Sequence, residues 1–311
     1  MILRKESGRP PLSGEERMEA ASLECLELLY RSEDYLVVNK HWDIRIDGKF
    51  WAEERTVQKQ LQHHFPQLAD PATYYGFRFC HQLDFSTSGA LCVALSKAAA
   101  GRAYHCFKNR LVIKAYLALV RGSVVDEKMT IDCAIGKSSV EGKTHMMCVE
   151  GTGGCENPKP SLTELTVLEF GAYDGDPVTK VLLQPRTGRT HQLRVHCTSI
   201  GHPIVGDYTY SLGSDSSPYR MMLHAYLLRI PLENEPLQVT APDPFLPSVD
   251  PKWTPQRRVR TMESVVEDIL ARPLVEETES LECSREERIR PEETEETKVQ
   301  CQQWLSEWPV D

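Results

Sequence analysis

The chain has 311 residues, of which 41% are hydrophobic, enough apolar side chains for one sizeable core. Its formal net charge is −9, and ten glutamates against four basic residues between Glu276 and Lys298 place −6 of that charge in one segment. The remainder is nearly balanced, which excludes a uniformly basic nucleic-acid-binding protein and requires a local basic patch for any polyanionic ligand.

Cysteine usage and hydropathy indicate the compartment. The ten cysteines lie singly, with no pair at the two-residue spacing typical of zinc sites or redox motifs, so we expect no structural disulfide and no metal site. Residues 1–8 lack an apolar signal core, and no apolar run approaches the ~18 residues that a membrane-spanning helix needs. We therefore expect an intracellular protein, cytoplasmic or nuclear, with no membrane partner.

The N-terminal part shows clear element signals. Residues 1–22 are polar and predict a mobile arm. The β-branched and aliphatic run at 35–39 predicts a strand. A helix is expected to begin after Thr56, a suitable N-cap, and to stop at Pro66. Ser96 is expected to cap the next helix in the same way.

A polar turn at His81–Gly89 lies between two apolar runs, 75–80 and 90–95, that are typical of buried strands. The turn carries Asp84, three consecutive hydroxyl residues and a terminal glycine. Proteins often display a nucleophile or general base on such a rigid frame. An aspartate can also simply bond the amides and hydroxyls of its own turn, so the local pattern leaves both interpretations open.

The strand expected at Val112–Val120 puts Lys114 and Tyr116 on one face, where an aromatic ring is most often part of the core. Paired strands are then expected at 131–136 and 144–149. Lys137 and Lys143 lie in or near their loops and either contact a polyanion or are ordinary solvated lysines.

Strands at 162–170 and 178–184 precede three arginines, Arg186, Arg189 and Arg194, in a short span where a helix is expected to open either at Thr187–Gly188 or at Thr190. A helix start with several guanidinium groups predicts a phosphate or carboxylate site. The expected buried stripe of this helix is Leu193, Cys197 and Ile200. His191 and His196 are about 140° apart on a helix, which argues against a shared metal.

A core strand is expected at 223–230, and the domain is expected to close near residue 255. Residues 256–311 are predicted to be an acidic, mostly disordered tail containing a short amphipathic helix at 262–271. Trp304 and Trp308 near the end are typical of a docking motif, either for the chain's own domain or for a protein partner. Deleting residues 258–311 is expected to change stability only modestly.

Several blocks together resemble one enzyme family. The blocks are His81–Gly89, Arg110–Gly122, Thr187–His196, Gly201–Asp207 and Leu223–Ala225. In this order and spacing they resemble the pseudouridine synthases of the large-subunit ribosomal type, and the resemblance covers roughly residues 25 to 250. It implies an α+β fold in which residues 23–255 form a single catalytic domain, with a mixed, mostly antiparallel sheet and flanking helices around a central cleft.

The resemblance also implies a reaction and a substrate. Uridine in ribosomal, transfer or messenger RNA would be isomerised to pseudouridine, with no metal and no other cofactor. Asp84 would be the catalytic carboxylate, Tyr116 would stack on the target base, and Arg194 would pair with Asp84 and keep it ionised. The expected RNA contacts are Gln82, Arg186, Arg189, His191, Lys137 and Lys143.

One departure from the family pattern leaves an alternative open. Gln82 stands where the family normally has arginine, so the chain could be a catalytically impaired RNA-binding protein with the same fold. A hydrolase that uses Asp84 with a histidine is a weaker rival, because no second carboxylate is offered at a recognisable spacing. A scaffold built around the terminal tryptophans is the third alternative. Asp84, Tyr116 and Arg194 together favour the enzyme.

Overall fold

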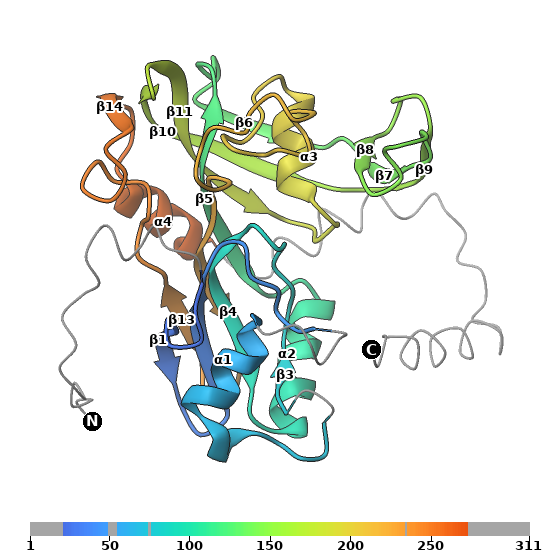
Figure 1. Ribbon diagram of the computed structural model, residues 1–311, viewed down its shortest axis with the longest axis vertical. Helices are drawn as coiled ribbons and strands as arrows, with labels where there is room; N and C mark the ends of the chain where they lie inside the picture. The colour runs from blue at the N-terminus through green and yellow to red at the C-terminus, as the bar shows by residue number, and fades with distance from the viewer. Residues whose placement is uncertain (1–20, 49–54, 74–75, 234, 273–311) are drawn as a thin grey trace.

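One mixed sheet runs through the computed structural model, which describes residues 21–48, 55–73, 76–233 and 235–272 (Figure 1). Its strands are β1 (Glu27–Arg31), β2 (Tyr35–Lys40), β3 (Arg78–Phe79), β4 (Ser88–Ala94), β5 (Ile113–Arg121), β6 (Lys128–Ile131), β10 (Thr163–Tyr173), β11 (Asp176–Pro185), β12 (Leu223–Ile230), β13 (Leu237–Thr240) and β14 (Trp253–Arg258). The main path is β1-β2-β4-β12-β5-β11-β10-β14, with β13, β3 and β6 pairing with β12, β4 and β10.

A second, three-stranded sheet has the order β8-β7-β9. It consists of β8 (Met147–Val149), β7 (Ile135–Ser138) and β9 (Cys155–Lys159), and the helices are α1 (Val57–His64), α2 (Lys97–Lys108), α3 (Gln192–Ser199) and α4 (Met262–Ala271), with a 3₁₀ turn at Pro66–Leu68. Figure 1 shows α1 and α2 at one end of the molecule and α3 with the small sheet at the other. Among the described residues, no helix is long and apolar enough to cross a membrane.

The predicted α+β class with a mostly antiparallel sheet is confirmed. Every pairing in the large sheet is antiparallel except that of β4 with β12. At this parallel pairing Gly89 has φ +112°, and a Cβ there would lie 2.3 Å from the carbonyl oxygen of Ala225. Only glycine allows the two backbones to approach so closely, and this contact fixes the strand that follows the Asp84 turn.

Local signals placed two helices correctly. The Thr56 hydroxyl accepts the Lys59 N–H over 3.1 Å at the start of α1, and the Ser96 hydroxyl accepts the Ala99 N–H over 3.1 Å at the start of α2. Both contacts satisfy backbone donors that the first turn of a helix leaves unpaired. The strand expected at 131–136 is instead divided between β6 and β7.

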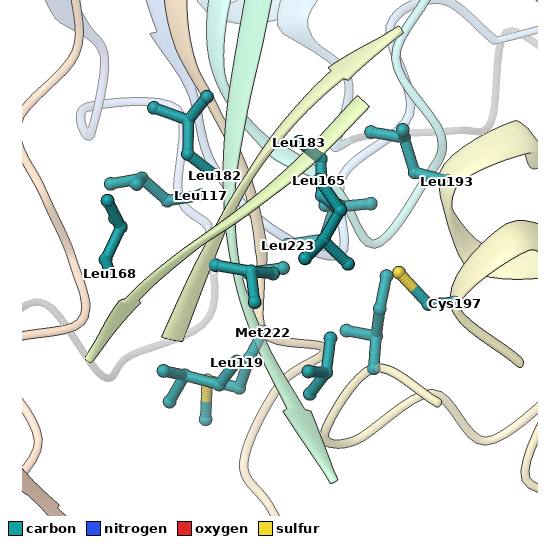
Figure 2. Packing of buried hydrophobic residues seen from close by; sticks show 14 of the residues in the cluster. Leu117, Leu119, Leu165, Leu168, Leu182, Leu183, Leu193, Cys197, Met222 and Leu223 are labelled. Atoms are coloured by element: carbon teal, nitrogen blue, oxygen red, sulfur yellow. The ribbon is translucent and has the colours of Figure 1, made fainter. Parts of the chain in front are cut away.

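The largest apolar cluster of the described residues joins the sheet to α3 and to α4. Figure 2 shows Leu193 and Cys197 of α3 facing Leu183 and Leu223 of the strands, and all four side chains are buried. Leu193 and Cys197 are four residues apart and therefore share one helix face. This packing fixes the rotation of α3 and so determines where its next side chain, Arg194, can point.

The chain remains folded past residue 255, since the expected boundary falls inside β14. Trp253 is buried where β14 pairs with β10. The helix expected at 262–271 is confirmed as α4, and its Val265 and Ile269 belong to the main apolar cluster. Residues 1–20 and 273–311, which include both terminal tryptophans, lie outside the described residues, so the division into arm, domain and tail stays a prediction.

Candidate active site

A cavity of about 570 Å³ lies where the turn before β4, strand β5, the end of β11 and the N-terminal end of α3 meet. Seven of the nine predicted site residues line it: Gln82, Asp84, Tyr116, Arg186, Arg189, His191 and Arg194. Lys137 and Lys143 do not line it; they are exposed on β7 and in the segment that follows it. The volume is within the range of about 300–1,000 Å³ that is usual for small-ligand sites.

Asp84 lies on a turn whose backbone is fixed by a hydrogen bond and by the burial of the preceding residue. The Thr87 N–H donates to the Asp84 carbonyl oxygen over 3.0 Å and closes the turn. Leu83, the preceding residue, is buried in the apolar cluster beside α1. The carboxylate itself keeps 27% of its side-chain surface exposed. The acid is thus displayed on a fixed backbone and remains accessible from the cavity.

Lys40, at the end of β2, fixes this turn, a role that was not predicted from the sequence. Its ammonium group donates to the carbonyl oxygens of Phe85 (2.9 Å), Thr87 (2.7 Å) and His41 (3.0 Å). The side chain is fully buried, and burial, followed by the positive charge of Arg220, lowers the pKa of Lys40 to about 7. The three carbonyl acceptors favour the charged form and offset part of this cost.

Arg194 contacts two carboxylates. Its Nε and Nη2 donate to the two oxygens of Asp207 over 2.7 and 2.8 Å, and its Nη1 lies 3.5 Å from Asp84 Oδ2. The guanidinium also lies over the Tyr210 ring, 4.9 Å from its centroid. Burial alone would lower the pKa of Arg194, but the hydrogen bonds and charge of Asp207, with the charge of Asp84, raise it above its usual value.

The expected pair of Asp84 and Arg194 is therefore present, but Asp207 is the closer and better-aligned partner. Asp207 is almost completely buried, so its bidentate pairing is screened far less than the contact with the partly exposed Asp84. Asp207 ends the Gly201–Asp207 block of the resemblance, but no role was predicted for it. The signal was present in that block, but the chain fold was needed to interpret it.

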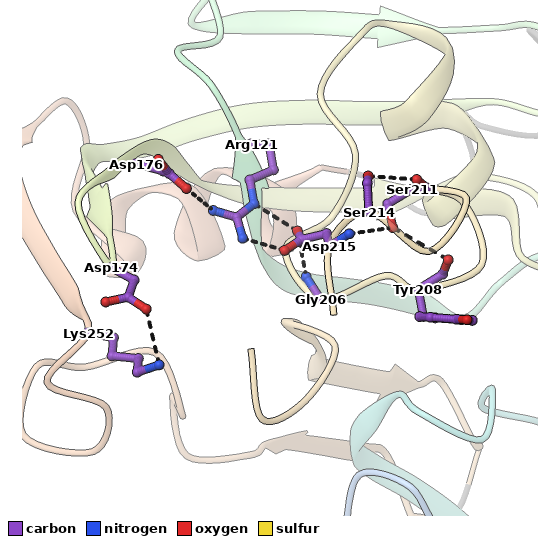
Figure 3. Close-up of polar contacts among 9 residues, drawn as sticks. All are labelled: Arg121, Asp174, Asp176, Gly206, Tyr208, Ser211, Ser214, Asp215 and Lys252. Carbon is purple, nitrogen blue, oxygen red and sulfur yellow. Dashed lines mark hydrogen bonds and ion pairs between the residues drawn. The ribbon is translucent and has the colours of Figure 1, made fainter. Parts of the chain in front are cut away.

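A second ion pair holds the loop that carries Asp207 (Figure 3). Arg121, at the end of β5, contacts Asp215 through Nε at 2.7 Å and Nη2 at 2.5 Å. Asp215 also accepts the Gly206 N–H over 3.0 Å. Glycine is required there because φ is +76° and a Cβ would lie 2.2 Å from the carbonyl oxygen of Arg220.

Tyr116 and Lys114 both lie on the cavity wall, as the alternation along β5 predicted. Burial, and then the negative charge of Asp84, raises the pKa of the Tyr116 phenol, so it stays protonated at neutral pH. Burial lowers the pKa of Lys114 to about 8. Within the described part of the chain no side chain pairs with Lys114, and a Cβ at Gly188 would lie 3.7 Å from its Nζ. Lys114 was not predicted as a site residue.

The two predicted arginines Arg186 and Arg189 differ in whether their hydrogen-bond partner is a carboxylate or a carbonyl oxygen. Arg186 donates through Nε to Glu164 over 3.0 Å, so part of its charge is already neutralised. Arg189 donates to the Pro160 carbonyl oxygen over 3.1 Å. Burial, followed by the charge of Arg110, lowers the pKa of Arg189. Arg110 also lines the cavity, so two like charges lie close together where an anion would relieve their repulsion.

The two histidines of this region have separate roles. His191 lines the cavity in a left-handed conformation, and its Nδ1 hydrogen-bonds the Tyr210 hydroxyl over 2.9 Å. His196 is fully buried and hydrogen-bonds Thr163 and the Cys133 carbonyl oxygen, each over 2.9 Å. Among the described residues, no three His, Cys, Asp or Glu side chains form a group that could hold a metal ion.

Helix α3 begins later than expected. Its N-cap is His191, one residue past the later of the two expected openings, Thr190, and residues 187–190 precede the helix. The Gln192 side-chain oxygen accepts the Thr187 hydroxyl over 2.7 Å and the Arg189 N–H over 3.0 Å. These hydrogen bonds give the Thr187 hydroxyl and the Arg189 N–H a partner within the loop. They keep Arg189 outside the helix, at the cavity wall. Leu193 and Cys197 of the expected stripe are buried, while Ile200 is only partly buried.

Comparison with known proteins shows which family this chain is similar to. A family model described as RNA pseudouridylate synthase matches residues 34–199. RNA pseudouridylate synthase domain-containing protein 1 from Danio rerio is 67% identical over 301 residues, covering 94% of this chain and 100% of that protein. The human protein of the same name is 56% identical over 317 residues, covering 94% and 99%. The dual-specificity RNA pseudouridine synthase RluA of Salmonella typhi is 35% identical over 207 residues, covering 66% and 86%.

Solved structures agree with the sequence comparisons. The structure of human RNA pseudouridylate synthase domain containing 1 matches with a TM-score of 0.75 at 58% identity, covering 82% of this chain and 98% of that one. Human RNA pseudouridylate synthase domain containing 4 matches with a TM-score of 0.56 at 22% identity, which supports the fold. The chain therefore belongs to the RNA pseudouridylate synthase family, the isomerases that convert uridine in RNA to pseudouridine.

Proposed function

We propose that this protein converts uridine to pseudouridine in RNA with Asp84 as the catalytic carboxylate. The observation that carries the proposal is the position of Asp84. Its accessible carboxylate lies on a fixed turn in a cavity, 3.5 Å from Arg194, and the phenol ring of Tyr116 lines the same cavity. The cavity thus combines a carboxylate, a guanidinium and an aromatic ring. This combination suits a uracil base, which must be held while the carboxylate reacts with the nucleotide.

The reaction rearranges the nucleotide without oxidation or loss of atoms. The bond between N1 of uracil and C1′ of ribose breaks, the base turns, and C5 bonds to C1′. One proton leaves C5 and one is gained at N1, so the chemistry needs a group that can engage the nucleotide and move protons. Asp84 is the carboxylate in position to do this. The target must leave its stack to reach Asp84, because a paired base is shielded on both faces.

Tyr116 and Arg194 assist in different ways. The Tyr116 ring supplies an apolar face on which the extruded base can stack, and its protonated hydroxyl adds no charge. Arg194, oriented by Asp207, places one guanidinium nitrogen toward Asp84. A nearby positive charge favours the ionised carboxylate when the base covers it and excludes water.

RNA would be held by the positive groups around the cavity. Arg189 and Arg110 lie close enough for their charges to interact, which supports a phosphate site between them. Gln82, Arg186 and His191 line the same cavity and are proposed as further contacts. Lys137 and Lys143 lie outside it, so we propose that they contact a part of the RNA beyond the target nucleotide. We assign no class of RNA.

The remaining proposals concern location and partners. The described cysteines are free, which suits a reducing compartment and supports a cytoplasmic or nuclear protein. The terminal Trp304 and Trp308 remain candidates for a protein-docking motif by composition alone.

Chemical mapping of pseudouridine across total RNA, with and without this protein, tests the proposed activity. We expect at least one modified uridine that disappears when the protein is absent and returns when the purified protein is added. No protein-dependent site in any RNA would favour the alternative, a catalytically impaired RNA-binding protein.

Gln82 is the residue that motivates that alternative, and its replacement tests it. Its side chain is exposed at the cavity, where it offers hydrogen bonds but no charge for phosphate. We expect Gln82→Arg to keep or raise turnover on structured RNA, measured as initial rates of pseudouridine formation. Loss of activity in a folded Gln82→Arg variant would show that this site is built around glutamine. The role that the resemblance implies for position 82 would then be wrong.

A further inference from the structure

Phe85, the residue that follows the proposed catalytic Asp84, presents an aromatic ring to solvent. Its side chain is 52% exposed. In the same turn, Asp84 just before it and Thr87 two residues after it line the cavity. Isolated exposed apolar residues are common on protein surfaces, so exposure alone assigns nothing. The location of Phe85 and the rigidity of its backbone carry the inference.

The backbone of Phe85 is fixed by a buried charge. Lys40 Nζ donates to the Phe85 carbonyl oxygen over 2.9 Å and also to those of Thr87 and His41. The exposed ring is thus attached to one of the most constrained backbone segments near the site. A side chain whose backbone is held in this way loses little conformational entropy when it binds a partner.

The same ammonium group joins a second aromatic turn to the first. His41 and Trp42 have ring centroids 4.7 Å apart, and Trp42 packs edge-on against Tyr219 at 5.6 Å. Both His41 and Trp42 are only partly buried. Lys40 therefore joins two turns that carry aromatic side chains, His41–Trp42 and the turn of Phe85. The second of these turns also carries Asp84.

The charges around the cavity indicate what this ring would contact. Lys108, Arg110 and Arg189 line the cavity, and their positive charges suit the phosphates of an RNA strand. RNA bases have a flat face that stacks on phenylalanine whatever their sequence. Gln82 lacks the charge and the planar guanidinium of an arginine, so little else on this turn can support a base next to the extruded uridine.

We propose that Phe85 is a base-stacking residue, whose ring stacks on the RNA base adjacent to the uridine that enters the cavity. This inference rests on the proposed function, because it assumes that RNA is the ligand of the Asp84 cavity. It assigns binding and positioning of the RNA, and not bond making, to Phe85. The Lys40 contacts make the ring available without rearrangement of the turn.

Fluorescence of an oligouridylate with one central 2-aminopurine tests the stacking, since stacking on an aromatic ring quenches this base. We compare the wild type with Phe85→Ala, Phe85→Leu and Phe85→Tyr. Tyr104→Ala is the matched control, because Tyr104 is an exposed aromatic residue on α2 that does not line the cavity. Melting curves for each variant confirm that it is folded.

We expect Phe85→Ala to weaken binding about tenfold, from the usual contribution of one base–aromatic stack, and to remove the quenching. Phe85→Tyr should restore both, while Phe85→Leu, which keeps an apolar side chain without a ring, should not. On cellular RNA modified by the wild type, Phe85→Ala should raise KM and leave kcat nearly unchanged. A merely structural role would not separate leucine from tyrosine in this way.

Two results overturn the proposal. One is binding and quenching by Phe85→Ala equal to those of Tyr104→Ala, and the other is full recovery with leucine. Failure of the proposed function is a different observation: the wild type would form no pseudouridine in any RNA, while the fluorescence experiment would still show whether Phe85 stacks on a base.

Discussion

Arg194 illustrates how unequal two contacts of one residue can be. With Asp207 it makes two aligned hydrogen bonds of 2.7 and 2.8 Å in a buried setting. With Asp84 it makes one 3.5 Å contact to a partly exposed carboxylate. Asp207 therefore orients the guanidinium, and the remaining nitrogen is left for Asp84. The residue pair implied by the resemblance is, in the structure, a set of three residues in contact.

Asp207→Asn should consequently impair both stability and activity. Breaking a buried pair leaves the arginine charge without its main partner, which typically costs about 3–5 kcal/mol of unfolding free energy. Asparagine retains one acceptor, so we expect the lower end of this range. Denaturant unfolding measures the loss, and pseudouridine assays measure the activity.

Asp176→Asn is the matched control for that variant. Asp176 also contacts an arginine, at 3.4 Å from Arg121, but it is 76% exposed, and exposed pairs contribute only about 0–1 kcal/mol. Equal unfolding curves for the two variants, with full activity in Asp207→Asn, would show that Asp207 does not hold Arg194.

Lys114 makes the site sensitive to pH in a defined direction. Its pKa is lowered to about 8 by burial, so the side chain is charged below that pH and neutral above it. We expect RNA affinity to fall as pH rises through about 8, because a positive charge beside the nucleotide is lost. Affinity is measured by titration of labelled RNA across this range.

Two substitutions at Lys114 separate charge from size. Lys114→Arg keeps its charge at every pH and should remove the decline above pH 8, whereas Lys114→Gln should bind weakly throughout. Lys137→Gln, at an exposed lysine outside the cavity, should retain the wild-type pH profile. A Lys114→Arg profile identical to that of the wild type would contradict the assignment.

At the scale of elements, the sequence predicted a helix start correctly where the capping residue's own side chain accepts a backbone N–H of the first turn. Thr56 and Ser96 cap their helices with their own hydroxyls, and both were visible in the sequence. Helix α3 has no side-chain cap, and its start is set by Gln192 contacts to a preceding loop. Nothing in the spacing of residues 187–190 reveals that choice, so the predicted start was early.

Helix α4 changes the expectation for the C-terminal tail. Val265 and Ile269 are buried in the main cluster, and Arg272 pairs with Glu164 at 2.8 Å. Burying an aliphatic side chain typically contributes about 1.5–3 kcal/mol. Deleting residues 258–311 should therefore lower the melting temperature by roughly 10 °C or more, in place of the modest change expected from composition.

Deleting only residues 273–311 is the control, because it keeps α4. We expect little change in melting temperature from this shorter deletion. Thermal unfolding of both truncations checks the difference. Similar melting temperatures for the two would mean that α4 contributes little, and a large loss from the shorter deletion would mean that the acidic segment or its tryptophans stabilise the domain.

At the scale of the whole molecule, the site forms where distant segments meet. Asp84 precedes β4, Tyr116 lies on β5 and Arg194 on α3, and the order of strands in the sheet brings them to one cavity. The motif blocks predicted this set because each block carries its own signature. Lys137 and Lys143, predicted as RNA contacts, lie with the separate β8-β7-β9 sheet or its loop, outside the cavity, so their role stays a prediction.

The residues that were missed depend on the tertiary fold. Lys40 acts through carbonyl oxygens about 45 residues away in sequence, and backbone acceptors leave no mark on the residue types. Asp207 depends on a loop held by Arg121 and Asp215. Lys114 became notable because it is partly buried at the cavity wall and the described structure gives its ammonium group no side-chain partner. Periodicity could place Lys114 on the correct face but could not show this.

The central claim, that Asp84 is the catalytic carboxylate, is tested most directly by Asp84→Asn. The amide preserves the size of the side chain and most of its hydrogen bonds but removes the reactive carboxylate. Purified wild-type and variant proteins are incubated with the same cellular RNA, and pseudouridine is mapped at each site that the wild type modifies. We predict a folded Asp84→Asn variant that binds this RNA normally and forms no pseudouridine, and measurable pseudouridine at any of those sites would contradict the account.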